Sequence, residues 1–248
     1  MVKSNLLKEN ERIDSLQRNG YSIIQNSTRF CFGMDAVLLS EFVSLKKGDE
    51  AIDLCTGTGV IPILLSAKTE AAHFVAVEIQ EEMADMAKRS VALNGIEDKI
   101  EVLCKDLNDL DGCFAVASFD AVTVNPPYMI PGKGLVNPDE SKAIARHEIK
   151  CTLSDVLTVS SRLLKNGGKF FMVHKPERLD EIIVAMKEAK IEPKRLRIVY
   201  PRVDQKPNMV LIEGSKCGNP GMIMEKPLII YDESGAYMPE VSKIYEEA

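Results

Sequence analysis

Short runs of apolar and β-branched residues alternate with helical segments along most of this chain, and this alternation is what most constrains its fold. The runs predict strands at 51–54, 74–77, 100–103, 119–124, 169–173, 195–200 and 209–213, and residues 226–231 could add one short strand. Helices are predicted at 36–43, 60–68, 80–94, 153–164 and 179–189. Such alternation favours a doubly wound α/β fold, with a mostly parallel seven-stranded sheet and right-handed crossovers. The last two strands follow each other directly, which predicts one antiparallel edge strand.

The size and charge of the chain fit one globular domain. We expect a single domain over residues 1–248, with an N-terminal extension at about 1–34 and a C-terminal tail at about 216–248. A net charge of −6 excludes a generally basic protein that coats nucleic acid, although a local basic face is possible. The first ten residues are polar, and no apolar run approaches the ~20 residues of a membrane span. We therefore expect a soluble, cytoplasmic protein.

Six scattered cysteines form no Cys-x-x-Cys pair: Cys31, Cys55, Cys104, Cys113, Cys151 and Cys217. This spacing argues against a structural zinc site and against a disulfide framework. We expect no metal, and mostly reduced thiols.

The segment after the strand at 51–54 has the composition of a ligand-binding turn. Asp53 lies in the strand, and Gly57, Thr58 and Gly59 follow it before the next helix. The two glycines permit a tight turn and a close approach of a ligand to the backbone. The third glycine of the dinucleotide-binding pattern is absent, so the turn needs no pyrophosphate in its ligand.

Two acidic residues are predicted at the carboxyl ends of the next two strands. Glu78 ends its strand at the place where an acid accepts hydrogen bonds from ribose hydroxyls. Asp106 follows the third strand, where it can accept from an adenine amino group. Either acid alone would more simply be a solvated strand end. Together with the glycine turn they indicate S-adenosylmethionine, which combines ribose and adenine without phosphate.

Asn125, Pro126, Pro127 and Tyr128 follow the strand at 119–124. Open α/β sheets bind their ligands at the carboxyl ends of strands. The two prolines fix φ twice and remove two N–H donors, which leaves a rigid loop rich in carbonyl acceptors. Such a loop suits a planar amino group held by its hydrogens, with Tyr128 stacking on the base to which it belongs. We expect these four residues to form the catalytic loop, with Asn125 also next to the cofactor.

These motifs resemble those of class I S-adenosylmethionine-dependent methyltransferases that methylate exocyclic or amide nitrogen. Within that class, the chain resembles the bacterial tRNA(Val) adenine N6-methyltransferase family. The resemblance spans roughly residues 10–215, and two further segments support it: 30–39 (FCFGMDAVLL) and 145–148 (ARHE). It implies N6-methylation of an adenine in tRNA, in the anticodon loop of a valine tRNA. Cys55 stands where many relatives carry glycine, and the turn forms with a cysteine there if its φ is negative.

Two groups of residues are candidates for contacting the RNA. Arg146 and His147 can position the base, although ordinary packing explains His147 slightly better. Lys194, Arg195 and Arg197 belong to a basic stretch that can meet phosphates. A solvated helix-and-strand face explains this stretch about equally well.

Three other functions compete with the tRNA assignment. A planar amide nitrogen fits the same loop, so the substrate could be a glutamine side chain in a protein such as a release factor. Enzymes of that kind usually carry a helical domain before the cofactor turn, and only 52 residues precede Asp53 here. Guanine N2-methylation of rRNA is a further alternative. A non-catalytic RNA-binding protein ranks last, because the cofactor acids and the catalytic loop are all present.

Overall fold

The computed structural model describes residues 6–29, 31–128 and 151–246. The strands are β1 (Glu11–Ser15), β2 (Ser22–Asn26), β3 (Glu50–Leu54), β4 (His73–Glu78), β5 (Ile100–Cys104), β6 (Phe119–Val124), β7 (Leu164–His174), β8 (Ile191–Tyr200), β9 (Met209–Lys216), β10 (Ile223–Met224) and β11 (Leu228–Ile229). The α-helices are α1 (Met34–Phe42), α2 (Val60–Lys68), α3 (Glu81–Asn94), α5 (Leu153–Leu163), α6 (Leu179–Glu188) and α7 (Pro239–Glu246). Short 3₁₀ helices are η2 (Leu107–Asp109) and η3 (Pro176–Arg178).

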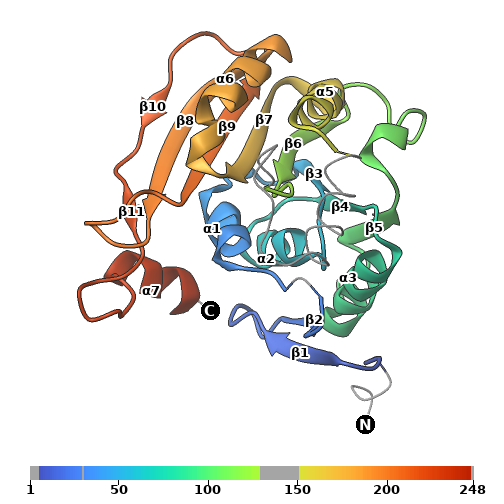
Figure 1. The fold of residues 1–248 in the computed structure, drawn as a ribbon. Coiled ribbons are helices and arrows are strands. Elements are labelled where there is room, and N and C mark those ends of the chain that lie inside the picture. The colour runs from blue at the N-terminus through green and yellow to red at the C-terminus, as the bar shows by residue number, and fades with distance from the viewer. Residues whose placement is uncertain (1–5, 30, 129–150, 247–248) are drawn as a thin grey trace.

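The central sheet of the described part runs in the order β10-β8-β9-β7-β6-β3-β4-β5, with β11 also paired to β8 (Figure 1). The pairs from β5 through β4, β3 and β6 to β7 are all parallel. The predicted doubly wound, mostly parallel sheet is thereby confirmed. The chain order reverses at β3, because β4 and β5 lie on one side of it and β6 and β7 on the other.

The antiparallel strand is not at the edge where the sequence predicted it. β9 lies inside the sheet, antiparallel to both β7 and β8. Two short strands of the C-terminal tail, β10 and β11, then pair in parallel with β8 and extend the sheet beyond seven strands. β11 falls within the short strand suggested at 226–231, whereas β10 was missed, because two residues carry no detectable alternation.

Helices cover both faces of the sheet, as Figure 1 shows. Successive residues of β7 belong to different cores: Phe171 and Val173 pack with α1, α2 and α3, whereas Phe170 and Met172 pack with α5 and α6. Side chains of a strand point alternately to its two faces, so a strand covered on both sides is apolar throughout. This explains why the parallel strands read as continuous apolar runs.

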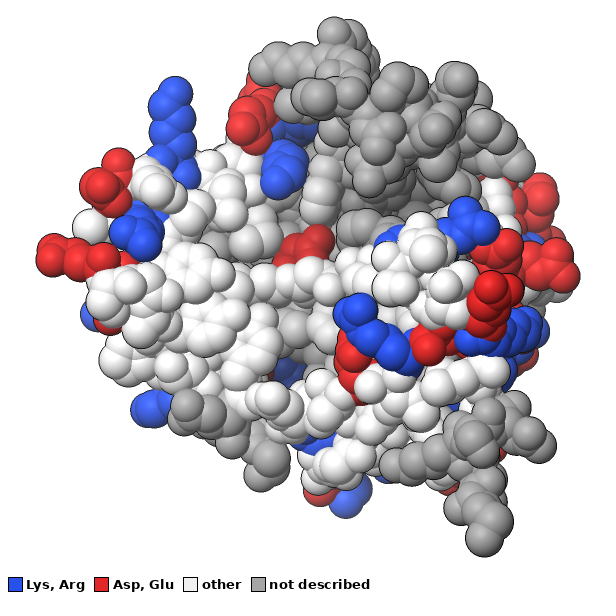
Figure 2. All heavy atoms as spheres, turned by 60° about the horizontal axis from the view of Figure 1, so that its bottom comes forward, with Lys and Arg blue, Asp and Glu red and all other residues white. Residues whose placement is uncertain are grey.

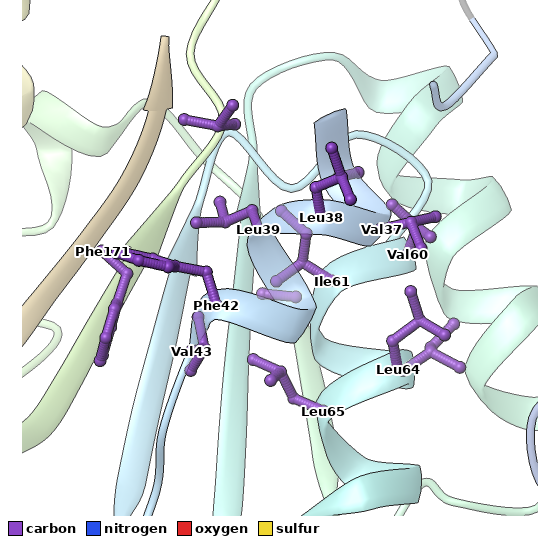
Figure 3. Close-up of a cluster of buried hydrophobic side chains, with 14 of the residues drawn as sticks. Val37, Leu38, Leu39, Phe42, Val43, Val60, Ile61, Leu64, Leu65 and Phe171 are labelled. Carbon is purple, nitrogen blue, oxygen red and sulfur yellow. The ribbon is translucent and has the colours of Figure 1, made fainter. Parts of the chain in front are cut away.

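The core beside α1 fixes that helix against the sheet. Val37, Leu38 and Leu39 of α1 lie among side chains of α2 in Figure 3. Phe42 meets Phe171 of β7 edge to face, with ring centroids 6.4 Å apart and planes at 88°. The N-terminal end of α1 is therefore held close to the carboxyl ends of the strands.

Both terminal segments pack onto the α/β core. In the N-terminal hairpin of β1 and β2, the backbone N–H of Ser22 donates to Asn94 Oδ1 of α3 at 2.8 Å, and that of Ile24 to Ser90 Oγ at 2.9 Å. Glu11 and Arg89 form an ion pair at 2.6 Å, which lowers the pKa of Glu11.

None of the helices within the described ranges is long and apolar enough to cross a membrane.

Candidate active site

The carboxyl ends of the parallel strands bring most of the predicted site residues to one edge of the sheet. β3 ends in the glycine turn, β4 ends at Glu78, and β6 runs into Asn125. The turn after β3 and the loop after β6 are neighbours, because Leu54 pairs with Val124. They flank the point where the strand order reverses, which is where open α/β sheets form a ligand crevice.

The turn after β3 uses three residues with left-handed backbone angles. Cys55, Gly57 and Gly59 have φ values of +58°, +59° and +84°. The φ of Cys55 is thus not negative, and the turn forms all the same, with a non-glycine residue in the left-handed region at a cost of about 1–3 kcal/mol. At Gly59 a side chain would also be crowded, since an added Cβ would lie 3.3 Å from Cβ of Ala87.

Glu78 ties the glycine turn to the next strand. Its Oε2 accepts a hydrogen bond from the backbone N–H of Gly57 at 2.9 Å, and its Oε1 accepts from that of Gln80 at 2.9 Å. The residue is buried, with 4% of its surface exposed. Each carboxylate oxygen has a second lone pair, so Glu78 can still accept from the two hydroxyls of a ribose.

Asp53 is a buried carboxylate with an unused oxygen. Thr123 Oγ1 donates to its Oδ1 at 2.5 Å. Within the described part, Oδ2 of Asp53 and Oγ1 of the buried Thr56 have no hydrogen-bond partner. Burial raises the pKa of Asp53 to about 7, against the opposing effects of the neighbouring Thr123 and Thr56 hydroxyls. A buried carboxylate with a free oxygen is suited to receive a positively charged ligand.

The catalytic loop contacts a residue that the sequence placed only at the start of a helix. The side-chain Nδ2 of Asn125 donates to Asp35 Oδ2 at 3.1 Å, and the Tyr128 hydroxyl donates to the same oxygen at 2.8 Å. The Tyr128 hydroxyl also contacts Asn125 Oδ1. Asp35 is in the first turn of α1, one residue before the predicted helix at 36–43, and its contact with the loop was missed.

The Tyr128 ring is held from the side by the end of β7. His174 meets the ring at a centroid distance of 5.3 Å and an interplanar angle of 66°. Burial, and secondarily the charge of Arg178, lowers the pKa of His174 to about 4, so its imidazole is neutral at pH 7. Lys175 places its Nζ 5.4 Å from the centroid of the Tyr128 ring. The sequence showed no partner for His174, because its contacts come from another strand end.

The remaining predicted site residues divide into three cases. Asp106 follows β5 as expected and accepts from the backbone N–H of Asn108 at 2.9 Å, which makes it the N-cap of η2. Thr58 is buried within the glycine turn. Arg146 and His147 lie outside the described residues.

The side chains of the predicted basic stretch form hydrogen bonds and ion pairs within the protein. Arg195 donates to Glu213 at 2.8 Å and to Glu225 at 2.9 Å, and its guanidinium lies 3.9 Å from the centroid of the Phe42 ring. Arg197 pairs with Glu240 of α7 at 2.7 Å. These contacts favour the structural interpretation of the stretch, and its role in phosphate binding stays a prediction.

Lys194 also bonds within the protein, through its Nζ to the backbone oxygen of Asn219 at 3.0 Å.

On the face of the molecule that Figure 2 shows, blue and red side chains are interspersed and the middle is largely uncharged. That face therefore carries no single basic patch among the described residues.

The acceptors at this edge of the sheet fit S-adenosylmethionine. That molecule presents an ammonium group, a sulfonium, a ribose diol and an adenine amino group, but no phosphate. The free oxygen of Asp53 suits a positive group, and the Glu78 carboxylate suits the diol. The role of Asp106 toward the adenine stays a prediction. Across the described ranges, no group of three or more His, Cys, Asp or Glu residues is arranged to hold a metal ion.

Comparison with solved structures places the fold among the methyltransferases. A predicted O-methyltransferase from Agrobacterium tumefaciens superposes with a TM-score of 0.71 at 24% identity, over 87% of this chain and 98% of that one. Geranyl diphosphate C-methyltransferase from Streptomyces coelicolor gives a TM-score of 0.58 at 15% identity, over 74% of this chain and 78% of that one. At these identities the likeness concerns the fold alone.

Comparison with known sequences identifies the family more specifically than the solved structures do. A family model described as a methyltransferase domain matches residues 51–135, which confirms the predicted enzyme class and, with it, S-adenosylmethionine as methyl donor. The tRNA1(Val) (adenine(37)-N6)-methyltransferase of Bacteroides thetaiotaomicron is 31% identical over 79% of this chain and 81% of that protein. The protein of the same name from Parabacteroides distasonis is 30% identical over 73% of this chain and 75% of its own length. This chain belongs to the family of tRNA1(Val) (adenine(37)-N6)-methyltransferases.

Proposed function

We propose that this protein transfers a methyl group to the exocyclic N6 amino group of an adenine in the anticodon loop of a valine tRNA. The observation that carries the proposal is the position of Asn125 and Tyr128. Both follow β6 beside the end of β3, the strand that carries Asp53, and their side chains are in contact with each other. The names of the relatives that share most of this chain support adenine 37 of tRNA1(Val) as the target.

The loop residues would act by holding the target nitrogen. An adenine amino group is a poor nucleophile, because its lone pair is delocalised into the ring. Asn125 Oδ1 and the backbone oxygen of Pro126 can each accept one amino hydrogen, which favours a lone pair directed out of the ring plane. Bound S-adenosylmethionine supplies an activated methyl group, and orientation of the nitrogen toward it provides most of the acceleration. No residue has to act as a general base, because the nitrogen loses its proton readily once it is alkylated.

Tyr128 would stack on the extruded base, an interaction worth ~1–3 kcal/mol. His174 fixes the ring from its edge, and Lys175 lies over the ring. The base must therefore use the opposite side of the ring or displace the flexible Lys175 side chain. Loop bases are already partly unstacked, so extruding one requires less free energy than opening a duplex pair.

Lys175 is the cation best placed for the backbone of the target nucleotide. Unlike Arg195 and Arg197, its ammonium has no acidic partner within the described ranges. A cation next to the stacking ring can meet the phosphate that flanks the extruded base. The net charge of −6 over the whole chain would meanwhile suppress indiscriminate RNA binding.

The test is methyl transfer from labelled S-adenosylmethionine to unmodified valine tRNA and, separately, to a release factor. Nucleoside analysis of the tRNA should yield N6-methyladenosine, and replacing the target adenine by another base should abolish labelling. Label on a glutamine of the release factor, with none on tRNA, would contradict the substrate assignment. Methylated guanine in rRNA would contradict it as well. Either result would leave the fold and the methyl donor unchanged.

A further inference from the structure

Asp35 contacts the catalytic loop directly, although it comes from a different part of the chain. One of its oxygens, Oδ2, accepts hydrogen bonds from Asn125 Nδ2 at 3.1 Å and from the Tyr128 hydroxyl at 2.8 Å. Its other oxygen, Oδ1, accepts from the backbone N–H of Ala36 at 2.9 Å. The carboxylate therefore connects the start of α1 to two residues of the loop.

We propose that Asp35 is a positioning residue, which sets the orientation of the Asn125 carboxamide so that its oxygen faces the target amino group. The inference rests on the proposed function, since it assigns Asn125 Oδ1 the task of accepting an amino hydrogen. A carboxamide has a donor end and an acceptor end of nearly equal shape, and rotation by half a turn exchanges them. A carboxylate accepts hydrogen bonds and cannot donate them, so it binds only the NH₂ end. The oxygen end is then directed away from Asp35.

The same carboxylate also competes for the Tyr128 hydrogen. The hydroxyl has one hydrogen and two neighbouring acceptors, Asp35 Oδ2 and Asn125 Oδ1. A charged acceptor forms the stronger hydrogen bond, so the hydrogen points preferentially to Asp35. Asn125 Oδ1 touches the hydroxyl oxygen on one side and keeps a lone pair for an amino hydrogen of the substrate. Burial and the Asp35 charge raise the pKa of Tyr128 well above its ordinary value, which keeps the hydroxyl protonated as a donor.

The surrounding structure holds Asp35 in this position. Helix α1 is anchored in the core through Leu38, Leu39 and Phe42. The residue before the helix is Gly33, and a Cβ there would lie 2.8 Å from Asp35 Oδ1. The missing side chain leaves room for the carboxylate. A rigid helix end with this clearance is suited to placing a side chain to within a fraction of an ångström.

A simpler role for Asp35 is to stabilise α1, since an acid in the first turn interacts favourably with the helix dipole. The two roles predict different measurements. Loss of helix stabilisation lowers the melting temperature and leaves turnover of the folded enzyme unchanged. Loss of amide orientation lowers kcat, with little effect on the melting temperature or on S-adenosylmethionine affinity.

The experiment compares Asp35→Asn with Asp180→Asn, which removes an exposed first-turn acid from α6. Turnover of tRNA is measured at saturating cofactor, cofactor affinity by calorimetry, and folding by thermal unfolding. We expect kcat to fall about 10- to 100-fold in Asp35→Asn, because the new carboxamide can bind either end of Asn125. Asp180→Asn should keep the wild-type kcat. Asp35→Glu, a second variant with the charge displaced by one methylene, should also lose turnover.

A double-mutant cycle with Tyr128→Phe tests the second part of the inference. If Asp35 acts partly by withdrawing the Tyr128 hydrogen, the combined loss of Asp35→Asn and Tyr128→Phe is smaller than the product of the two separate losses. A loss of kcat in the double variant equal to the product of the two separate losses would contradict this coupling. A kcat within twofold of wild type in folded Asp35→Asn and Asp35→Glu would overturn the inference as a whole. Each kcat is expressed as a ratio to that of the wild type. A wild type that is inactive on tRNA would contradict the proposed function and not the role of Asp35. The same ratios can then be measured with the release factor as substrate.

Discussion

Thr123 donates its hydroxyl hydrogen to Oδ1 of Asp53 at 2.5 Å, across the boundary between β6 and β3. Both side chains are buried, and the second oxygen of Asp53 has no hydrogen-bond partner in the described part of the chain. The arrangement satisfies half of the carboxylate and leaves the other half for a ligand. Burial of the carboxylate raises its pKa to about 7, although the hydrogen bond from Thr123 opposes the rise.

This raised pKa predicts pH-dependent binding of S-adenosylmethionine. Ionised Asp53 attracts a positively charged ligand and protonated Asp53 does not, so affinity should rise as the pH increases through about 7 and then level off. Calorimetric titration between pH 5.5 and 8.5, chosen as roughly one to two units on each side of that pKa, measures the effect. Asp53→Asn should bind weakly and without this pH dependence. Equal pH profiles for the two proteins would contradict the assignment of Asp53.

The same shift has a consequence for stability. The folded protein holds the Asp53 proton more tightly than the unfolded chain, whose carboxyl has its ordinary pKa of 3.8. Stability of the cofactor-free protein should therefore decrease as the pH rises from about 4 to about 7, and Asp53→Asn should remove that contribution. Denaturant unfolding of both proteins at several pH values gives the difference.

Asn125→Ala should abolish turnover and leave cofactor affinity near normal. The substitution removes the proposed acceptor for the target amino group, while the acids predicted to bind the cofactor, Asp53 and Glu78, remain. The measurement is single-turnover methyl transfer to tRNA, with calorimetry of the same variant. Near-wild-type turnover in the folded protein would remove Asn125 from the mechanism.

Glu78→Ala should weaken S-adenosylmethionine binding by ~1.5–3 kcal/mol for each charge-assisted hydrogen bond lost to the ribose. The carboxylate also binds the N–H groups of Gly57 and Gln80, so this variant should loosen the glycine turn as well. Glu78→Gln keeps one oxygen acceptor in a side chain of the same shape. Its affinity for S-adenosylmethionine should lie between those of wild type and Glu78→Ala. Unchanged cofactor affinity in both folded variants would mean that Glu78 serves only the turn.

Lys175 and Arg195 should differ in what their replacement affects. Lys175→Gln should weaken tRNA binding and reduce its salt slope by about 1, because one phosphate contact is lost, with stability unchanged. Arg195→Met should lower the free energy of unfolding by about 1–3 kcal/mol, because Glu213 and Glu225 lose a partner. Filter binding at several salt concentrations and denaturant unfolding distinguish the two effects. A normal salt slope in Lys175→Gln, together with a flatter one in Lys194→Gln, would instead support the basic stretch as the RNA contact.

Much of the fold and of the site follows from local patterns in the sequence. Apolar runs of strand length, helices between them and a glycine turn after β3 are properties of neighbouring residues, so they can be predicted without knowing what packs where. The ends of parallel strands meet at one edge, and for this reason Asp53, Glu78 and Asn125 could be assigned to one site. The short strand β10 and the left-handed backbone at Cys55 gave no comparable signal.

The sequence by itself thus determined the strand–turn–helix order and the chemistry carried by the Asn-Pro-Pro-Tyr loop. Only the tertiary structure decided which distant residues meet that loop. Asp35 reaches Asn125 across 90 residues of chain, and Arg195 reaches the backbone oxygen of Phe42 across 153. Such contacts depend on how the helices and the antiparallel strand dock on the sheet, and that docking is a sum of many weak packing interactions that no local pattern records.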